Sequence, residues 1–301
     1  MNPATGAPAT RTTTIAPILV GWYPTAARPL PWREPGVTPW GILVSEFMAQ
    51  QTPVARVTPH WREWMSRWPT PACLAAESPA TAVRAWDRLG YPRRALWLHR
   101  TATIITTECN GDVPREIATL LTLPGVGPYT ARAVAAFAFG DRHPVVDTNT
   151  RRVIARAVHG QAEAGSPRTA ADLADMLALL PITASDAQTF NAAIMELGAT
   201  VCTAASPACG ACPIAAHCAW QQAGCPAHRG PRAARQARYE GSDREVRGLI
   251  MSALRHTHRP VPRIELAALW QDAAQFTRAL VSLVSDGLAV EHRDGFTLPE
   301  T

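Results

Sequence analysis

The chain has 301 residues, of which 47% are hydrophobic and 18% charged, and a formal net charge of +5. This composition is typical of a globular protein that can bury more than one core. No apolar run approaches the roughly 20 residues that cross a membrane, and the N-terminus has no apolar segment of signal-peptide length. We therefore expect a cytoplasmic protein with no membrane partner. The basic charge fits a nucleic-acid partner, but it is equally typical of a mildly basic protein.

Two residue counts narrow the chemistry. All 29 basic residues are arginine, because the chain contains no lysine. A reaction through a lysine Schiff base is therefore excluded. The seven cysteines, in a chain without an export signal, favour a reduced compartment and a metal site over a disulfide framework.

The first part of the chain has a mainly helical pattern. Residues 1–14 predict a disordered leader, and a helix follows. Residues 40–157 are mostly helical in pattern, and Trp61, Trp64 and Trp68 recur at helical spacing. Such a stripe indicates a core rather than a cofactor site. Further helices are predicted over roughly 169–180 and 186–200.

Glu46 is the first candidate functional residue, in the segment WGILVSEFMAQQT. Apolar neighbours on the same helix predict that its carboxyl group is partly buried. Desolvation favours the protonated form of a carboxyl group, so Glu46 is a candidate general acid. The alternative is an ordinary exposed glutamate on an amphipathic helix.

The segment LPGVGPYTARAV at 123–134 places two glycines and a proline directly before a helical run. A helix N-terminus exposes amide groups and a partial positive charge, which together favour a phosphate group. We expect the amides of Val126, Gly127 and Tyr129 to face one oxyanion. A plain turn between two helices is an equally good interpretation.

Asp147, in VVDTNTRRVIARAV, lies where another helix is expected to begin. One interpretation is structural, because Asp147, Thr148 or Asn149 can cap that helix. The other is a carboxylate kept ionised by the helix dipole and amides. Such an anion would suit a cation that develops during a reaction.

Cys202, Cys209, Cys212 and Cys218 have the spacing C-x6-C-x2-C-x5-C. Structural zinc usually uses paired short knuckles, whereas a [4Fe–4S] cluster accepts four cysteines at less regular spacing. The spacing favours iron–sulfur over zinc, and both over four unligated cysteines.

The composition changes near residue 226. Residues 226–240 predict an exposed basic linker, either an arm that follows phosphates or a solvated tether. Helical spacing returns over 243–255, 263–270 and 273–286, and an Asp-Gly turn then signals a hairpin. Residues 241–301 therefore predict a small winged-helix-like module, which either contacts DNA or packs on the main domain.

The cysteine spacing directly after FNAAIMELGATVC resembles the iron–sulfur loop of helix-hairpin-helix DNA glycosylases of the endonuclease III superfamily. Within that superfamily, SEFMAQQT resembles the motif of the adenine DNA glycosylases, the MutY family. The motifs LPWR, LGY, LPGVGPYT, VVDTNTRRV and MELGA occur in family order. The resemblance spans roughly residues 15–225.

This resemblance implies an all-α glycosylase fold. A six-helix barrel would occupy about 38–146, and the N-terminal helix with 147–225 would form an iron–sulfur module. The four cysteines would hold a [4Fe–4S] cluster. The helix-hairpin-helix segment LPGVGPYT would bind a monovalent or calcium ion. The expected partner is double-stranded DNA containing a mispaired adenine. The protein would act as a monomer, associated with the nucleoid.

The resemblance also implies an activity: removal of adenine mispaired with 8-oxoguanine or guanine, which leaves an abasic site. Glu46 would protonate adenine and then handle water, and Asp147 would stabilise the sugar cation. Tyr129 would lie near the catalytic glutamate and Asn149 near the sugar. Superfamily members that also cleave the DNA backbone carry lysine where this chain has Tyr129. We therefore expect a monofunctional enzyme, which removes the base but does not cleave the DNA backbone.

Further residues match the family's binding positions. The resemblance places an adenine pocket at Trp32, Arg33 and Glu196. It places residues that wedge into the duplex at Gln50, Gln51 and Tyr91, and a phosphate grip at Gly125, Val126 and Gly127.

The sequence departs from the family in two places. Pro92 replaces the usual second aromatic residue after Tyr91, and residues 241–301 are too few for the large β-rich domain that recognises 8-oxoguanine. Two other functions stay open: a glycosylase of the same fold acting on T or U opposite G, and a noncatalytic iron–sulfur regulator that binds DNA. Glu46 and the LPWR and MELGA motifs oppose the first, and Glu46 with Asp147 opposes the second.

Overall fold

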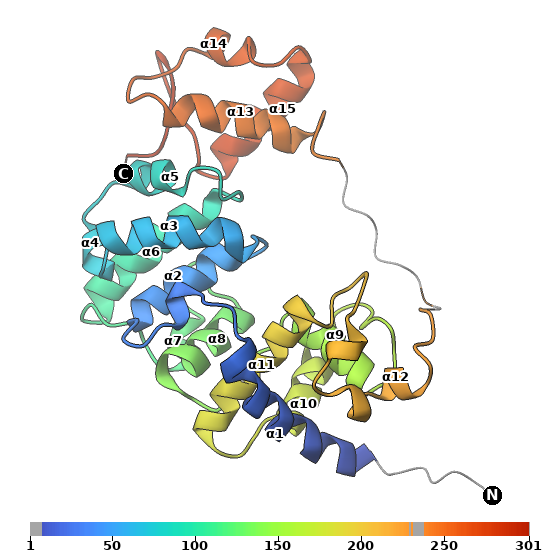
Figure 1. Ribbon diagram of the computed structural model, residues 1–301. Helices are drawn as coiled ribbons and strands as arrows, with labels where there is room; N and C mark the ends of the chain where they lie inside the picture. Colours follow the sequence, from blue (N-terminus) through green and yellow to red (C-terminus); the bar gives the residue numbers. More distant parts are fainter. Residues whose placement is uncertain (1–7, 229, 231–237, 301) are drawn as a thin grey trace, which may run out of the picture. The chain divides into compact units, whose positions relative to one another are not determined.

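The computed structural model describes residues 8–228, 230 and 238–300 (Figure 1). Most of the predicted basic linker, including Arg229, Arg232 and Arg235, lies outside these residues. The described residues fall into two compact units. The first unit contains the described residues of Met1–Pro35, Arg115–Ile117 and Gly127–Ala234. The second unit contains those of Gly36–Pro114, Ala118–Val126 and Arg235–Thr301.

The first unit is helical. Its elements are α1 (Pro8–Ala26), the 3-10 turn η1 (Pro31–Arg33), α8 (Pro128–Phe139), α9 (Thr148–Ala157), α10 (Thr169–Leu179), α11 (Ala184–Thr200), the 3-10 turns η2 (Cys209–Ala211) and η3 (Ala215–His217), and α12 (Ala219–Gln222). Helix α1 packs on α11, and α11 packs on α9. Ile15, Phe190 and Ile194 are buried in the core that these helices share. Helix α1 begins at Pro8, inside the segment 1–14 that was expected to be disordered. Once Ile15 is buried, each further helical residue adds a backbone hydrogen bond, which favours this extension.

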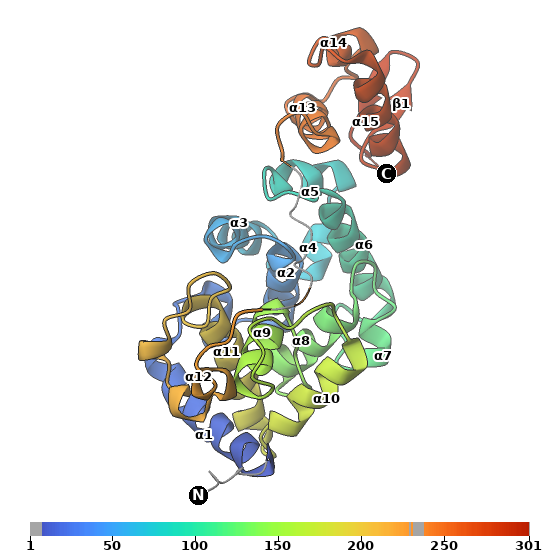
Figure 2. The same cartoon turned by 90° about the vertical axis from the view of Figure 1, so that its right-hand side faces the viewer.

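The second unit contains the first helices of the expected barrel (Figure 2). They are α2 (Pro39–Ala49), α3 (Val54–Arg67), α4 (Pro71–Ala75), α5 (Pro79–Trp86), α6 (Arg93–Glu108) and α7 (Ile117–Leu120), of which Ile117 falls in the first unit. The tryptophan stripe lies in the core, as predicted, because Trp61, Trp64 and Trp68 are at most 7% exposed. Trp64 packs edge-on against Trp68 at 4.7 Å and against Trp86 at 5.5 Å. These contacts join α3 to α5.

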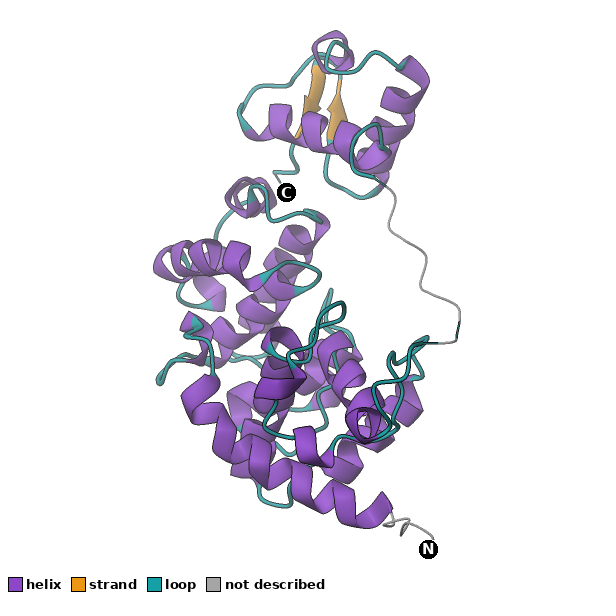
Figure 3. Cartoon of the chain, turned by 45° about the vertical axis from the view of Figure 1, so that its right-hand side comes forward, coloured by secondary structure: helices purple, strands orange, loops and turns teal. Residues whose placement is uncertain are grey.

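The C-terminal module also belongs to the second unit. It contains α13 (Asp243–Arg255), α14 (Arg263–Ala267), α15 (Ala273–Ser285) and the antiparallel pair β1 (Val290–His292) and β2 (Gly295–Thr297). The two strands stand among helices in Figure 3. The register pairs Val290 with Thr297 and His292 with Gly295, so Arg293 and Asp294 form the turn. The predicted three helices and hairpin are confirmed.

The C-terminal module has side-chain contacts with two helices of its unit. Arg84 of α5 donates to the carbonyl of Thr257 at 3.2 Å, and Arg93 of α6 pairs with Asp286 at 3.1 Å. The module therefore packs on α5 and α6 within its unit.

None of the described helices has the length and apolar character that a membrane span requires.

Candidate active site and cysteine pocket

Glu46 lies on α2, which begins at the N-cap Thr38. The Thr38 hydroxyl accepts a hydrogen bond from the Gly41 amide at 3.2 Å, and Pro39 fills the first helical position, where proline is favoured. Leu43 and Phe47 on the same helix are fully buried, and Glu46 is half-buried. The structure therefore confirms the expected partial burial of Glu46.

The glycine hairpin joins α7 to α8. Gly125 has φ +76°, and a Cβ there would lie 2.8 Å from Phe47 Cε1, so glycine is required. The Val126 amide donates to the Leu123 carbonyl at 3.1 Å, and the Val126 side chain is buried. The expectation that this amide faces a phosphate is therefore wrong, because the amide closes the turn. Gly127 is the N-cap of α8, and Tyr129 lies half-buried in its first turn.

Asp147 is the N-cap of α9, so the capping interpretation is confirmed. Its Oδ1 accepts from the Thr150 amide at 2.7 Å, and its Oδ2 accepts from Asn149 Nδ2 at 2.8 Å. Both carboxylate oxygens are thus hydrogen-bonded while the residue stays half-buried.

A chain of hydrogen bonds continues from Asp147 toward the cysteine loop. Arg152 Nη2 donates to Asn149 Oδ1 at 2.7 Å, and Arg152 Nε donates to the Cys202 carbonyl at 2.8 Å. Gly198 permits this arrangement, because a Cβ there would lie 2.7 Å from Asn149 Cβ. The residues that cap α9 are therefore connected to the segment that carries Cys202.

Glu196 of α11 is fully buried between two arginines. Its Oε1 accepts from Arg28 Nε at 2.5 Å, and its Oε2 accepts from Arg33 Nη1 at 2.9 Å. Arg28 adds Nη2 to Oε2 at 3.2 Å and its backbone amide to Oε1 at 3.2 Å. Arg33 also lies over the Tyr23 ring at 5.6 Å. Trp32, beside Arg33 in η1, is buried.

This cage fixes the charge of Glu196. Burial by itself would raise the pKa of Glu196, but the hydrogen bonds and charges of Arg28 and Arg33 outweigh it, so the pKa lies below the ordinary 4.5. Glu196 is therefore a carboxylate at neutral pH. Burial also raises the pKa of Tyr23, although Arg33 opposes that shift.

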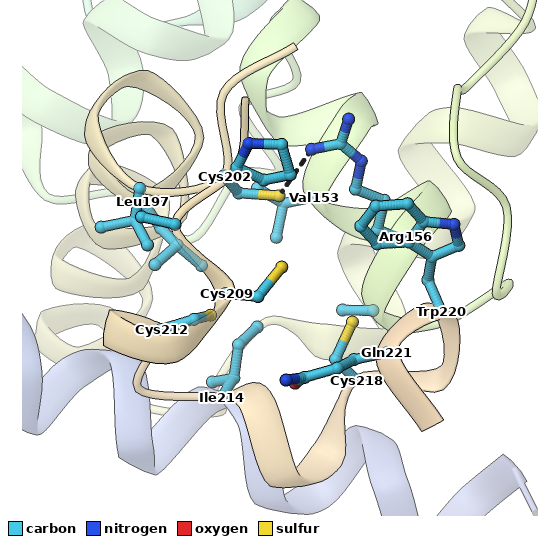
Figure 4. Close-up of a pocket in the computed structure, with 14 residues that line it drawn as sticks. Val153, Arg156, Leu197, Cys202, Cys209, Cys212, Ile214, Cys218, Trp220 and Gln221 are labelled. Carbon is cyan, nitrogen blue, oxygen red and sulfur yellow. Dashed lines mark hydrogen bonds between the residues drawn. The ribbon is translucent and has the colours of Figure 1, made fainter. Parts of the chain in front are cut away.

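The four clustered cysteines line one pocket (Figure 4). The pocket spans about 370 Å³, part of it open to solvent, and its other walls include the apolar side chains of Val153, Leu197 and Ile214. The 3-10 turns η2 and η3 place Cys209, Cys212 and Cys218, and Cys202 follows α11. Burial raises the pKa of the Cys212 thiol to about 11.

Arg156 closes one side of this pocket. Its Nη1 donates to Cys202 Sγ at 3.3 Å and to the Thr203 carbonyl at 2.7 Å, and its guanidinium lies over the Trp220 ring at 4.9 Å. Within the described part of the chain, no three or more His, Cys, Asp or Glu side chains are grouped so as to hold a single metal ion. The thiols are thus gathered around one space without converging on one point.

The predicted wedge residues lie in two turns of the second unit. Gln50 is the C-cap of α2, Gln51 follows it with φ +54°, and Tyr91 precedes α6 with φ +48°. Tyr91 is 47% exposed. Gln50 Nε2 donates to the Gly125 carbonyl at 3.4 Å, which connects the α2 turn to the glycine hairpin.

Within each unit the structure therefore brings predicted residues together. Asp147 contacts Asn149, Arg33 contacts Glu196, the four cysteines share a pocket, and Gln50 contacts Gly125. Sequence reasoning missed Arg28, because its partner Glu196 is 168 positions away. The only available signal was a second arginine shortly before LPWR.

Comparisons with known proteins identify relatives of this chain. The model of a family described as "HhH-GPD superfamily base excision DNA repair protein" matches residues 44–177. An adenine DNA glycosylase of Mycobacterium tuberculosis is 56% identical over 283 residues, which cover 93% of this chain and 92% of that protein. A thymine/uracil-DNA glycosylase of Pyrobaculum aerophilum is 34% identical over 200 residues, 65% of this chain and 86% of that protein.

A solved structure, that of a thermostable thymine-DNA glycosylase, superposes with a TM-score of 0.66 at 24% identity. The superposition covers 72% of this chain and 100% of that one, and it shows the fold alone. The expected glycosylase fold is confirmed. The chain belongs to the helix-hairpin-helix superfamily of base excision DNA repair proteins, and within it to the family of adenine DNA glycosylases. It is therefore a DNA glycosylase.

Substitution of Glu196 by Gln tests the buried cage. A carboxyl group whose pKa is lowered by folding stabilises the folded state above its ordinary pKa, and this stabilisation is lost as the pH falls through the folded pKa. Because hydrogen bonds to a charged group are lost, we expect Glu196→Gln to lower the free energy of unfolding by about 2 kcal/mol at pH 7, measured by chemical denaturation. The difference from wild type should shrink as the pH falls below 4.5.

Glu265→Gln is the matched control, because Glu265 pairs with Arg259 at the surface, where both side chains are about half exposed or more. Such a pair contributes about 0–1 kcal/mol. A loss in Glu196→Gln that is no larger than in Glu265→Gln, or that stays constant below pH 4.5, would contradict the assigned role of the cage.

Proposed function

We propose that the protein hydrolyses the N-glycosidic bond of adenine mispaired with 8-oxoguanine or guanine in double-stranded DNA, leaving an abasic site. The observation that carries this proposal is the half-buried position of Glu46 among buried residues of α2. Adenine is a poor leaving group until its ring is protonated, so its removal needs a sheltered proton donor. The 56% identity to an adenine DNA glycosylase supports the same substrate.

The two carboxylates would have different roles. The target nucleotide must leave the base stack before the bond can be reached. Glu46 then protonates N7 of adenine, and the bond to the sugar breaks with positive charge developing on the sugar. Asp147, whose carboxyl oxygens accept hydrogen bonds from Thr150 and Asn149, stabilises that charge or captures it transiently, and Glu46 next assists the attack of water. This division follows the logic of glycoside hydrolysis by paired carboxyl groups.

Neighbouring residues would bind the base and the sugar. Trp32 and Arg33 line the adenine pocket, and Asn149 lies near the sugar. Because both Glu196 oxygens accept hydrogen bonds from arginines, we infer that Glu196 fixes the position of Arg33 in this pocket. Tyr129 belongs to the same catalytic set. Tyr129 replaces the lysine of the backbone-cleaving enzymes, so the enzyme makes no Schiff base and has no lyase activity of that kind.

DNA would be held mainly through backbone contacts. The hairpin residues Gly125 and Gly127 approach phosphates, with a monovalent or calcium ion at the hairpin carbonyls. Gln50, Gln51 and Tyr91 enter the duplex as the base leaves. A monomer in the cytoplasm, associated with the nucleoid, is sufficient for this work.

A [4Fe–4S] cluster fits the cysteine pocket better than zinc. Four zinc thiolates must all lie about 2.3 Å from one point, and the described residues offer no such group. Each thiolate of a [4Fe–4S] cluster binds a different iron atom, which suits thiols spread around a pocket. Cys202, Cys209, Cys212 and Cys218 would hold the cluster, which when bound cross-links the loop after α11. Arg152 and Asn149 connect that loop to Asp147.

Removal of thymine or uracil opposite guanine is the second candidate, because the Pyrobaculum aerophilum relative carries that name at 34% identity. Single-turnover assays on duplexes with A:8-oxoG, A:G and T:G decide between the two.

We expect Glu46→Gln to reduce adenine excision by roughly 10²–10⁴-fold, the usual contribution of a general acid, and to leave DNA binding intact. Activity on T:G alone, or undiminished excision by the variant, would refute the proposal.

Asp147→Asn separates capping from catalysis. Asparagine caps a helix about as well as aspartate, so we expect the free energy of unfolding to change by less than about 0.5 kcal/mol. The negative charge is lost, and excision should fall by roughly 10²–10³-fold. Asp272→Asn is the control, since Asp272 caps α15 in the same way, and it should leave excision unchanged. Equal excision rates in the two variants would mean that Asp147 only caps the helix.

Metal analysis tests the cysteine pocket. Protein purified without air should be brown and contain about four iron and four sulfide ions per chain, as measured by colorimetric assay. Cys212→Ser should lower this content, while Cys73→Ser, at an exposed position outside the pocket, should not. Zinc in place of iron, or equal iron content in both variants, would contradict the assignment.

A further inference from the structure

The two turns that carry the proposed wedge residues have unusual backbones. Gln51 has φ +54° and Tyr91 has φ +48°. A bulky residue rarely adopts this left-handed region, and it persists only where the surrounding structure enforces it. Gln51 and Tyr91 are 40 positions apart in the chain, so a tertiary contact must hold the two turns together.

Arg94, in the first turn of α6, supplies that contact. It is only 3% exposed despite its charge. Its Nη2 donates to the Gly90 carbonyl at 2.9 Å, directly before Tyr91. On the other side the same guanidinium reaches the end of α2 and the turn that follows: Nη1 to the carbonyls of Phe47 (2.7 Å), Met48 (3.1 Å) and Gln50 (2.6 Å), and Nη2 to the Thr52 hydroxyl (3.0 Å).

Three other contacts reinforce this link. The Thr52 hydroxyl donates to the Leu89 carbonyl at 3.2 Å, so Thr52 also connects the two turns. The Arg94 guanidinium lies over the rings of Trp86, at 5.1 Å, and Tyr91, at 5.6 Å. The wedge residue Tyr91 is therefore held through its ring as well as through its backbone.

A planar guanidinium suits this position. Burial lowers the pKa of Arg94 to about 10, so the group still carries its charge at neutral pH. Carbonyl oxygens on several sides compensate that charge. A lysine ammonium presents its donors from one atom and cannot bridge groups that lie this far apart.

We propose that Arg94 is a positioning residue that makes the turn of Gln50–Gln51 and the turn of Tyr91 one rigid wedge for base extrusion. The proposal rests on the proposed function, because it takes these residues to enter the duplex. Arg94 would act before the bond is broken, and it would touch neither the base nor the sugar. Its loss should therefore slow excision only where the adenine must be pulled out of a paired stack.

Two substrates separate extrusion from chemistry. One duplex carries adenine opposite 8-oxoguanine, and the other carries adenine in a single-nucleotide bulge, where little unpairing is required. Single-turnover excision rates are measured on both, and 2-aminopurine beside the adenine reports extrusion by its fluorescence. The variants are Arg94→Met, the milder Thr52→Val, and the control Arg100→Met, which removes an exposed arginine from the same helix.

We expect Arg94→Met to slow excision of the paired adenine by roughly tenfold or more, and that of the bulged adenine by less than about threefold, since only the paired adenine must first be unpaired. Thr52→Val should show the same selectivity at about threefold. The fluorescence rise should fall in parallel, and Arg100→Met should behave as wild type. The proposal is overturned by equal losses on the two substrates, or by unchanged rates in both variants.

Two remaining outcomes are also informative. If Arg94→Met does not fold, Thr52→Val decides, because it removes only one hydroxyl from the link. If wild-type protein excises adenine from neither substrate, the proposed function fails. The 2-aminopurine signal on the mispaired duplex then tests the wedge by itself, and no difference between wild type and Thr52→Val would overturn it.

Discussion

Several irregular segments of this protein depend on buried or half-buried arginines that donate to backbone carbonyls. Irregular loops leave carbonyl groups that no helix or strand satisfies, and an unsatisfied buried carbonyl is costly. Arg94 donates to several such groups in the turns around Gln50 and Tyr91, Arg152 donates to the carbonyls of Gly198 and Cys202 at the end of α11, and Arg156 donates to those of Thr203 and Ala204 in the cysteine loop. Each guanidinium thus stabilises a loop and also fixes its shape.

The chain contains no lysine, and these contacts are ones that an arginine side chain can make and a lysine side chain cannot. A flexible ammonium group concentrates its donors at one atom, whereas a guanidinium spreads five across a rigid plane. Arg156 illustrates the difference, because it contacts a thiol, three carbonyls and the face of Trp220 from one position. Loops held in this way can present side chains from irregular backbone with little freedom.

The elements were more predictable than the contacts between them. Helix α13 matches the predicted range 243–255, and the tryptophan stripe and cysteine grouping follow from spacing, because local periodicity decides which face is buried. Arg28 and Arg94 were not predictable as structural centres. Arg28 pairs with Glu196, 168 positions away, and Arg94 donates to Phe47, 47 positions away, as well as to Gly90. An arginine in a helical pattern, such as Arg94, is usually predicted to be exposed. The role of the Val126 amide was also missed, since a turn can use its own donors.

The fold alone would have suggested another substrate. The superposed solved structure is a thymine-DNA glycosylase, and an adenine and a thymine/uracil enzyme both match the sequence at 34% identity or more. A shared fold does not determine which base is removed. What separates the two reactions chemically is protonation of the departing base, which adenine requires at its ring. The assignment of the chain to the adenine DNA glycosylases rests on its similarity to such an enzyme over most of its length, and the half-buried Glu46 of α2 is the side chain to which we assign that protonation.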